Sequence, residues 1–359
     1  MKKHILFILI WVAVFPLFTA SAQTKVIKTT ASKSNDYGIE YFLPKTVLKV
    51  HIEYSKITQK AGEYARYAEK QLGIKAPDIT EEDQVFYALD QISVTPIGVP
   101  NRDASYLVEL KSKTTAPFVY LTEDGLICTI NAEYSPEKAT SPTATKSQTV
   151  QKTDPQTIFT EEYLRAGSKS KMAEILSKQI FKIRESRNDI LTGEADNVPR
   201  DGEGIRLVLA NLEAQEKALV EMFTGTSATE KMTAVFELEP QGNIEKQVLF
   251  RFSKYAGVVD SDDLSGSPVY INVKKTDDPV EEPVDPKRKA KEPQSIVYNI
   301  PGKARVEIYY GTNRMFDGEQ QIVQFGKTQI LTPSLFEDKK APVQVYFYPH
   351  TGAIKQIIQ

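Results

Sequence analysis

The stretch Tyr37-Gly-Ile-Glu-Tyr-Phe-Leu-Pro-Lys-Thr-Val-Leu-Lys-Val-His-Ile-Glu-Tyr54 decides the fold class of this chain. It predicts two β-strands that meet at Pro44. In the second strand, apolar and polar side chains alternate, and successive side chains of a strand point to opposite faces. One face therefore carries Leu48, Val50, Ile52 and Tyr54, and the other carries Lys49, His51 and Glu53. We expect the first face to meet a core and the second to meet water.

Similar patterns predict four more strands in the first third of the chain, at residues 91–96, 105–111, 118–121 and 126–132. The turn Glu123-Asp124-Gly125 joins the last two as a hairpin. A helix is expected at residues 62–72, because Tyr64, Ala68 and Leu72 are four positions apart and Gly73 stops it.

Two longer helices are predicted in the middle of the chain, where apolar side chains recur every three or four positions. The two apolar stripes consist of Met172, Ile175, Leu176, Ile180, Ile183, Ile190 and Leu191, and of Ile205, Val208, Leu209, Leu212, Leu219, Met222 and Phe223. The connector, residues 192–202, is short and rich in turn formers, so the helices should form an antiparallel hairpin.

The β pattern returns after the second helix. Strands are predicted at residues 233–239, 247–252, 269–273, 295–299, 304–310, 319–325 and 343–348, with a final strand that ends at Gln359. Turns are expected at residues 240–243, 301–302 and 349–352. Many short strands separated by turns favour an antiparallel sandwich or open barrel.

Two segments have the composition of disordered chain. Residues 136–153 are rich in Ser and Thr and lack aromatic side chains, and residues 274–293 mix charges of both signs with prolines. The expected fold is therefore α+β and mostly antiparallel β. Its expected organisation is a signal peptide (1–22), an N-terminal α+β domain (23–135), a flexible linker (136–155), a helical hairpin (156–228) and a C-terminal antiparallel β domain (229–359) with a disordered insertion (274–293).

The N-terminus has the three parts of a secretory signal peptide: two lysines, an apolar run and the small-residue triplet Ala20-Ser21-Ala22. The apolar run is too short to span a bilayer, which needs roughly 20 residues. An uncleaved anchor is the alternative, but Pro16 interrupts the run. We expect cleavage between Ala22 and Gln23, which leaves a mature chain with no transmembrane segment outside the cytoplasm.

The composition argues against several classes of function. The 45 Lys and Arg residues nearly balance the 47 Asp and Glu residues, so no strong field would attract nucleic acid. The single cysteine, Cys128, forbids an internal disulfide. It alternates with Leu126 and Ile130, and we expect a buried core thiol rather than a nucleophile.

Three blocks of sequence carry a family resemblance. They are Tyr41-Phe-Leu-Pro-Lys-Thr-Val-Leu48, Gly62-Glu-Tyr-Ala-Arg-Tyr-Ala-Glu-Lys-Gln-Leu-Gly73, and Leu191-Thr-Gly-Glu-Ala-Asp-Asn-Val-Pro-Arg-Asp-Gly202 with Glu216 and Phe223-Thr-Gly225 downstream. Most of the mature chain resembles the exported family from gut Bacteroidales catalogued as domain of unknown function 4831. The resemblance implies a periplasmic or outer-membrane-associated protein. It supplies no activity, cofactor or catalytic residue.

No motif in the sequence predicts a catalytic residue or a bound cofactor. There is neither a nucleophile elbow nor a complete phosphate loop, and the histidines of the mature chain, His51 and His350, lie far apart. Asp196 and Asp201 in the connector are the candidate metal ligands, for calcium. Their spacing does not match a helix-loop-helix calcium site, and turn formation and helix capping account for them better.

A candidate binding surface lies near the C-terminus, where alternation places Tyr346 and Tyr348 opposite Val345 and Phe347. Exposed aromatic rings suit the binding of sugars or proteins, and aromatic pairing between strands is the alternative. We therefore expect a non-catalytic envelope protein that serves as a binding or structural module. Its ligand is unidentified, and its partner would be another envelope protein or a glycan. A carboxylate-dependent hydrolase of glycans or other envelope polymers is the alternative function.

Overall fold

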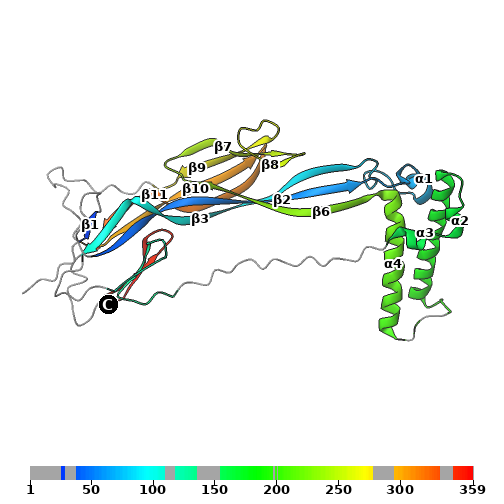
Figure 1. The fold of residues 1–359 in the computed structure, drawn as a ribbon, viewed down its shortest axis with the longest axis horizontal. Coiled ribbons are helices and arrows are strands. Elements are labelled where there is room, and N and C mark those ends of the chain that lie inside the picture. Colours follow the sequence, from blue (N-terminus) through cyan, green and yellow to red (C-terminus); the bar gives the residue numbers. More distant parts are fainter. Residues whose placement is uncertain are drawn as a thin grey trace, which may run out of the picture.

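The computed structural model describes residues 26–28, 38–109, 118–135, 154–196, 199, 201–277, 295–331 and 343–358. The molecule is elongated, with a β-rich body at one end and a helical head at the other (Figure 1). Two long strands run from the body to the head. They are β2 (Gly38–Lys60) and β3 (Gln84–Glu109), which pair antiparallel.

The first sheet contains four antiparallel strands in the order β1-β3-β2-β6, where β1 is Val26–Lys28 and β6 is Thr226–Leu238. The expected faces of β2 are confirmed, because Leu48, Val50 and Ile52 are fully buried while Glu53 is exposed. The expectation of two strands meeting at Pro44 was wrong. A register shift between Phe42 and Pro44 leaves Leu43 of β2 opposite four residues of β3, 101–104. The extra residues bulge from β3, and β2 continues through Pro44.

Residues 91–96 and 105–111 were also expected to be separate strands, but residues 91–96 and 105–109 both belong to β3, and residues 110–111 lie outside the described residues. Residues 97–100 between them stay extended because β2 pairs with them, Pro44 lying opposite Pro100 and Thr46 opposite Gly98. Long-range pairing therefore overrides the local turn signals in β3.

The second sheet has the order β11-β10-β9-β7-β8 and packs against the first across a shared apolar core. Its strands are β7 (Ile244–Ser253), β8 (Gly257–Val259), β9 (Ser267–Lys275), β10 (Val297–Tyr310) and β11 (Asn313–Ile330). The turn expected at residues 301–302 is instead a register shift inside β10. This position, Gly302, requires glycine, because the Cβ atom of any other residue would clash with the carbonyl oxygen of Phe325, at 2.5 Å.

The third sheet is small and has the order β13-β12-β5-β4. Its strands are β4 (Val119–Leu121), β5 (Ile127–Ile130), β12 (Gln344–Tyr348) and β13 (Ala353–Ile358). The expected β4–β5 hairpin is confirmed, with Gly125 at a φ of +80° in its turn. Because β5 pairs with β12 and β2 pairs with β6, strands that are far apart in the sequence share sheets.

The head contains the expected helical hairpin of α3 (Lys169–Thr192) and α4 (Gly202–Thr224). Shorter helices surround it: η1 (Ala65–Tyr67), α1 (Ala68–Leu72), η2 (Pro155–Ile158) and α2 (Glu161–Leu164). The helix expected at residues 62–72 thus begins at Ala65, as a 3₁₀ turn. The head has its own core, centred on Tyr64, Leu176, Ile180 and Phe223.

The mostly antiparallel β fold with a helical hairpin is confirmed. Within the described residues, no helix combines the length and apolar character needed to cross a membrane. The expected signal peptide and flexible linker segment 136–153 lie outside the described residues. So do residues 278–293 of the expected insertion, whereas its first residues, Lys274 and Lys275, belong to β9.

Candidate functional site

A groove of about 650 Å³ lies on the outer face of the small sheet. It is formed by β5, β12 and β13, together with the segment after β5 and the turn after β12. The residues that line it, some through their main chain, are Cys128, Thr129, Glu133, Tyr134, Ser135, Tyr346, Phe347, Tyr348, Pro349, His350, Lys355, Gln356 and Ile358. Both members of the candidate binding surface, Tyr346 and Tyr348, are among them.

Strand alternation gives the small sheet one apolar face and one aromatic, polar face. Val345 and Phe347 are buried in the core beneath the sheet. Tyr346 and Tyr348 point the other way, and Tyr348 is 40 % exposed. The expected orientation of these two tyrosines is therefore confirmed.

A β-bulge brings a cation to the Tyr348 ring. Tyr346 pairs with Gln356 and Phe347 pairs with Ile354, so Lys355 is an extra residue in β13. Its ammonium nitrogen lies 5.5 Å from the centroid of the Tyr348 ring, within the range of a cation–π interaction. The edge of His350 contacts the same ring at 5.6 Å between centroids. These neighbours orient the exposed ring without covering it.

The turn that closes one end of the groove is fixed to the body. Asn299, in β10, donates from Nδ2 to the carbonyl oxygens of Thr351 at 3.0 Å and Pro44 at 3.1 Å. Its main-chain N–H bonds to the carbonyl of Gly352 at 3.0 Å. Gly98 allows the turn to approach β3, because a Cβ atom there would lie 2.3 Å from the carbonyl oxygen of His350. The groove therefore rests on a rigid support.

Cys128 lies behind the groove and is fully buried, as expected. Burial raises the pKa of its thiol to about 11, which keeps it protonated at neutral pH. Its sulfur donates to the carbonyl oxygen of Leu126 at 3.7 Å. The thiol is part of the packing and lacks the electropositive setting of a nucleophile.

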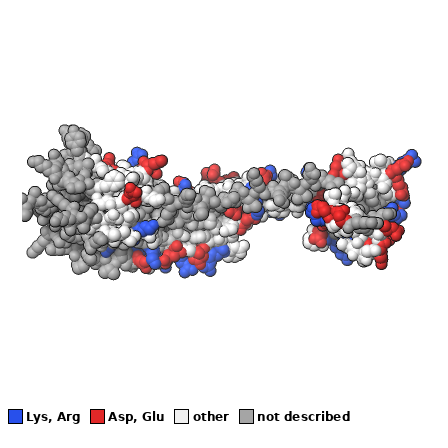
Figure 2. Space-filling model, turned by 90° about the horizontal axis from the view of Figure 1, so that it is seen from below, with Lys and Arg blue, Asp and Glu red and all other residues white. Residues whose placement is uncertain are grey.

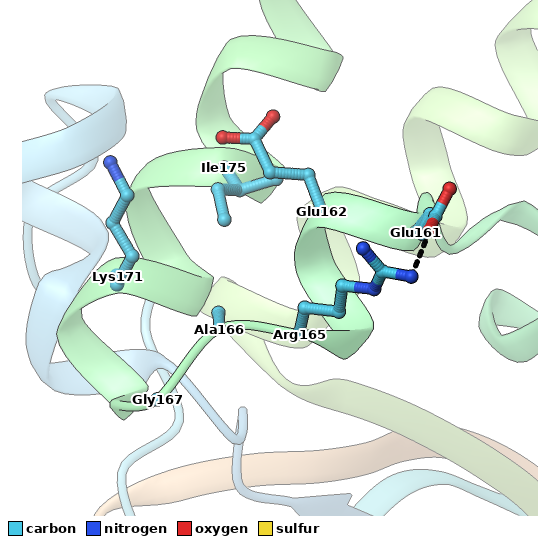
Figure 3. Close-up of a pocket in the computed structure, with 7 residues that line it drawn as sticks. All are labelled: Glu161, Glu162, Arg165, Ala166, Gly167, Lys171 and Ile175. Atoms are coloured by element: carbon cyan, nitrogen blue, oxygen red, sulfur yellow. Dashed lines mark ion pairs between the residues drawn. The ribbon is translucent and has the colours of Figure 1, made fainter.

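A second hollow, of about 560 Å³, lies on the head (Figure 3). Glu161, Glu162, Arg165 and Lys171 line it, and Arg165 pairs with Glu161 at 2.6 Å. Figure 3 shows the carboxylates of Glu161 and Glu162 pointing apart. This hollow therefore lacks the converging pair of carboxylates that glycoside hydrolysis requires.

Strand register sets two other carboxylates opposite each other, those of Glu307 in β10 and Asp317 in β11. Arg305 binds Asp317 through two hydrogen bonds, of 2.8 Å and 2.7 Å, and Arg314 also pairs with it. These contacts hold the pKa of Asp317 below its usual range. The cluster is an ion-pair network on the sheet surface, which offsets the repulsion between facing carboxylates.

The candidate metal ligands do not come together. Asp201 is the N-cap of α4 and accepts from the Gly204 N–H at 2.6 Å, whereas Asp196 is exposed. Within the residues that the structure describes, no group of three His, Cys, Asp or Glu side chains is placed to hold a metal ion.

The charged side chains on the surface are mixed in sign. Figure 2 shows positive and negative side chains interspersed on the body and the head, with no large patch of one sign on the face in view.

The family comparison covers the strands that carry the groove except the last three residues of β13. The sequence profile described as "Domain of unknown function (DUF4831)" matches residues 37–355. The chain belongs to this family. Comparison of this DUF4831 member with curated proteins finds no match, and comparison with solved structures finds none.

Sequence reasoning identified the two tyrosines of the groove and missed its polar partners. Glu133 follows β5, and Lys355 and Gln356 lie in β13, so they meet only because β12 pairs with both strands. No local pattern indicates that pairing. The bulge at Lys355 has no turn residue to mark it, so this missed partner of Tyr348 left no signal in the sequence.

Proposed function

We propose that this protein is a non-catalytic, exported envelope protein that binds a glycan in the groove of the small sheet. The observation that carries the proposal is the exposed ring of Tyr348, fixed between His350 and Lys355 inside a polar groove. An exposed ring that is oriented inside a groove is available to stack on a ligand.

The groove suits a sugar because its lining alternates aromatic faces with hydrogen-bonding groups. A pyranose ring has apolar C–H faces and a hydroxylated edge. Tyr346 and Tyr348 supply aromatic rings for stacking, and Glu133 and Gln356 supply polar groups. Ligand sites commonly combine aromatic walls with a few polar groups in this way. A protein partner would require a wider apolar patch around the rings.

The hydrolase alternative has no comparable support. Among the described residues that line the groove, Glu133 is the one carboxylate, and hydrolysis of a glycosidic bond by the usual mechanism uses two. We therefore propose binding without cleavage.

Export is part of the proposal and has its own test. Residues 1–22 have the order of a signal peptide, so the protein isolated from the periplasm or outer membrane should begin at Gln23. Mass spectrometry of the N-terminal peptide measures this directly. A protein that retains Met1–Ala22 in the cytoplasmic fraction would contradict the proposed location.

Binding can be tested by calorimetric titration of the mature protein with soluble hexasaccharides of glucose, xylose, mannose and N-acetylglucosamine. We expect at least one to bind and Tyr348→Ala to weaken that binding about tenfold or more. Tyr255→Ala is the matched control, because Tyr255 is 78 % exposed on the body outside the groove. Release of reducing ends during incubation would show hydrolysis instead.

A further inference from the structure

Two more exposed aromatic rings lie on the far edge of the small sheet. Phe118 directly precedes β4 and is 56 % exposed, and Tyr120 within β4 is 37 % exposed. The rings contact each other edge to face, with 4.8 Å between centroids. Phe118 is held in place by Asn131, which accepts the Phe118 N–H on its side chain at 3.1 Å and donates its own N–H to the Phe118 carbonyl at 2.7 Å.

Strand register places this pair on the same face as the groove. Tyr120 pairs with Thr129, Thr129 pairs with Tyr346, and Tyr346 pairs with Gln356. Residues directly opposite each other in antiparallel strands project to the same side. Tyr120 and Tyr346 therefore lie on one face of the sheet, on either side of the small Thr129.

The spacing of the two aromatic pairs decides what kind of ligand could use both. Tyr120 and Tyr346 are two strands apart, which corresponds to roughly 10 Å. One pyranose ring is shorter than this distance. A ligand that touches both pairs must therefore be a chain that runs across the strands.

We propose that Phe118 and Tyr120 form a second subsite, and that the ligand is an extended, multi-unit glycan bound across β4, β5, β12 and β13. This inference rests on the proposed glycan binding at Tyr348. It further specifies that the glycan has several units and runs across the strands. The exposure of both rings at the edge of the sheet fits this role. Single exposed aromatic side chains are common on protein surfaces, whereas contiguous exposed apolar side chains mark binding sites.

The test is a length series of the oligosaccharide that binds best, from one to six units, titrated against three proteins. The wild type should gain affinity with length. The double variant Phe118→Ala/Tyr120→Ala should bind the longest oligomer about tenfold more weakly and the shortest oligomer equally well. Tyr348→Ala should weaken the binding of every length.

The outcomes separate the two proposals. If affinity rises with oligomer length equally in the wild type and the double variant, while Tyr348→Ala still binds weakly, the second subsite is overturned and the proposal of binding in the groove stands. If the wild type binds no oligomer, both proposals fail. A double variant that binds all lengths normally would also overturn the second subsite. If the wild type sediments as a dimer and that variant as a monomer, β4 is a protein contact. Thermal unfolding of each variant checks that these exposed truncations leave the fold unchanged.

Discussion

The hydroxyl of Tyr41 satisfies both main-chain hydrogen-bonding groups of Val297. It accepts from the Val297 N–H at 2.9 Å and donates to the Val297 carbonyl at 3.2 Å. Tyr41 is fully buried, and burial raises the pKa of its hydroxyl well above the usual range. The side chain of Tyr41 in β2 therefore makes the two hydrogen bonds that a neighbouring strand would otherwise make to Val297 in β10. The two residues are 256 positions apart in the sequence.

Replacing Tyr41 by Phe should destabilise the fold by about 2–6 kcal/mol, because two buried main-chain groups lose their partner at about 1–3 kcal/mol each. Chemical denaturation measures the free energy of unfolding. Tyr54→Phe is the matched control, since Tyr54 is also buried and its hydroxyl has no hydrogen-bond partner among the described residues. Equal, small losses for both variants would show that the Tyr41 bonds contribute little.

Glu216 joins the two long helices of the head. Its carboxylate accepts from Arg184 at 2.6 Å and from Arg187 at 2.8 Å, and its side chain is only 13 % exposed. Glu216→Ala should cost about 1–3 kcal/mol, because charge-assisted bonds are lost and two arginines are left facing each other. Arg206→Ala should cost less than about 0.5 kcal/mol, because Arg206 pairs with Glu203 where both side chains are 75 % exposed. Similar losses for the two variants would contradict this ranking.

The connector between the helices provides a test of capping against calcium binding. Asp201→Asn should change stability little and Asp201→Ala should cost about 1 kcal/mol, because Asn also caps helices and Ala does not. Asp196→Asn, at an exposed position, serves as the control. We expect millimolar calcium to leave the melting temperature unchanged in all of these proteins. A calcium-dependent rise that Asp201→Asn abolishes would show a site.

Cys128 should make the fold sensitive to alkaline pH. Its pKa is raised from 9.0 to about 11 by burial, so the unfolded chain loses the thiol proton more easily than the folded chain. The contribution of this group to stability is therefore full below pH 9 and is lost as the pH rises toward 11. Denaturation at several pH values should show a steeper alkaline loss for the wild type than for Cys128→Ala. A thiol reagent at pH 8 that labels the native protein rapidly would contradict the burial.

The sequence predicted what depends on neighbours along the chain and missed what depends on distant pairing. Alternation in β2, the helical hairpin and the β4–β5 turn are encoded locally, and the structure confirms them. Pro44 and Gly302 read as breaks in the sequence. They lie in long strands because partner strands pair on both sides of each bulge.

The same division applies to the candidate site. The outward orientation of Tyr346 and Tyr348 follows from period-two alternation, which any single strand displays. The relation of Tyr346 to Tyr120 depends on β5 lying between β4 and β12, and those strands come from opposite ends of the chain. Side-chain bonds such as that of Asn299 to Pro44 likewise follow from sheet packing and leave no periodic signal.

The ribbon of β2, β3 and β6 has a mechanical consequence. β2 extends from the body to the head, where it ends at Lys60. Beside this end, β3 begins at Gln84 and β6 begins at Thr226 (Figure 1). Within the described residues, tension applied along the long axis is carried by three backbone segments in parallel. Strand-to-strand hydrogen bonds resist twisting between these segments, whereas one peptide would act as a swivel. A load on the helices is thereby transmitted to the sheets as a pull along the strands.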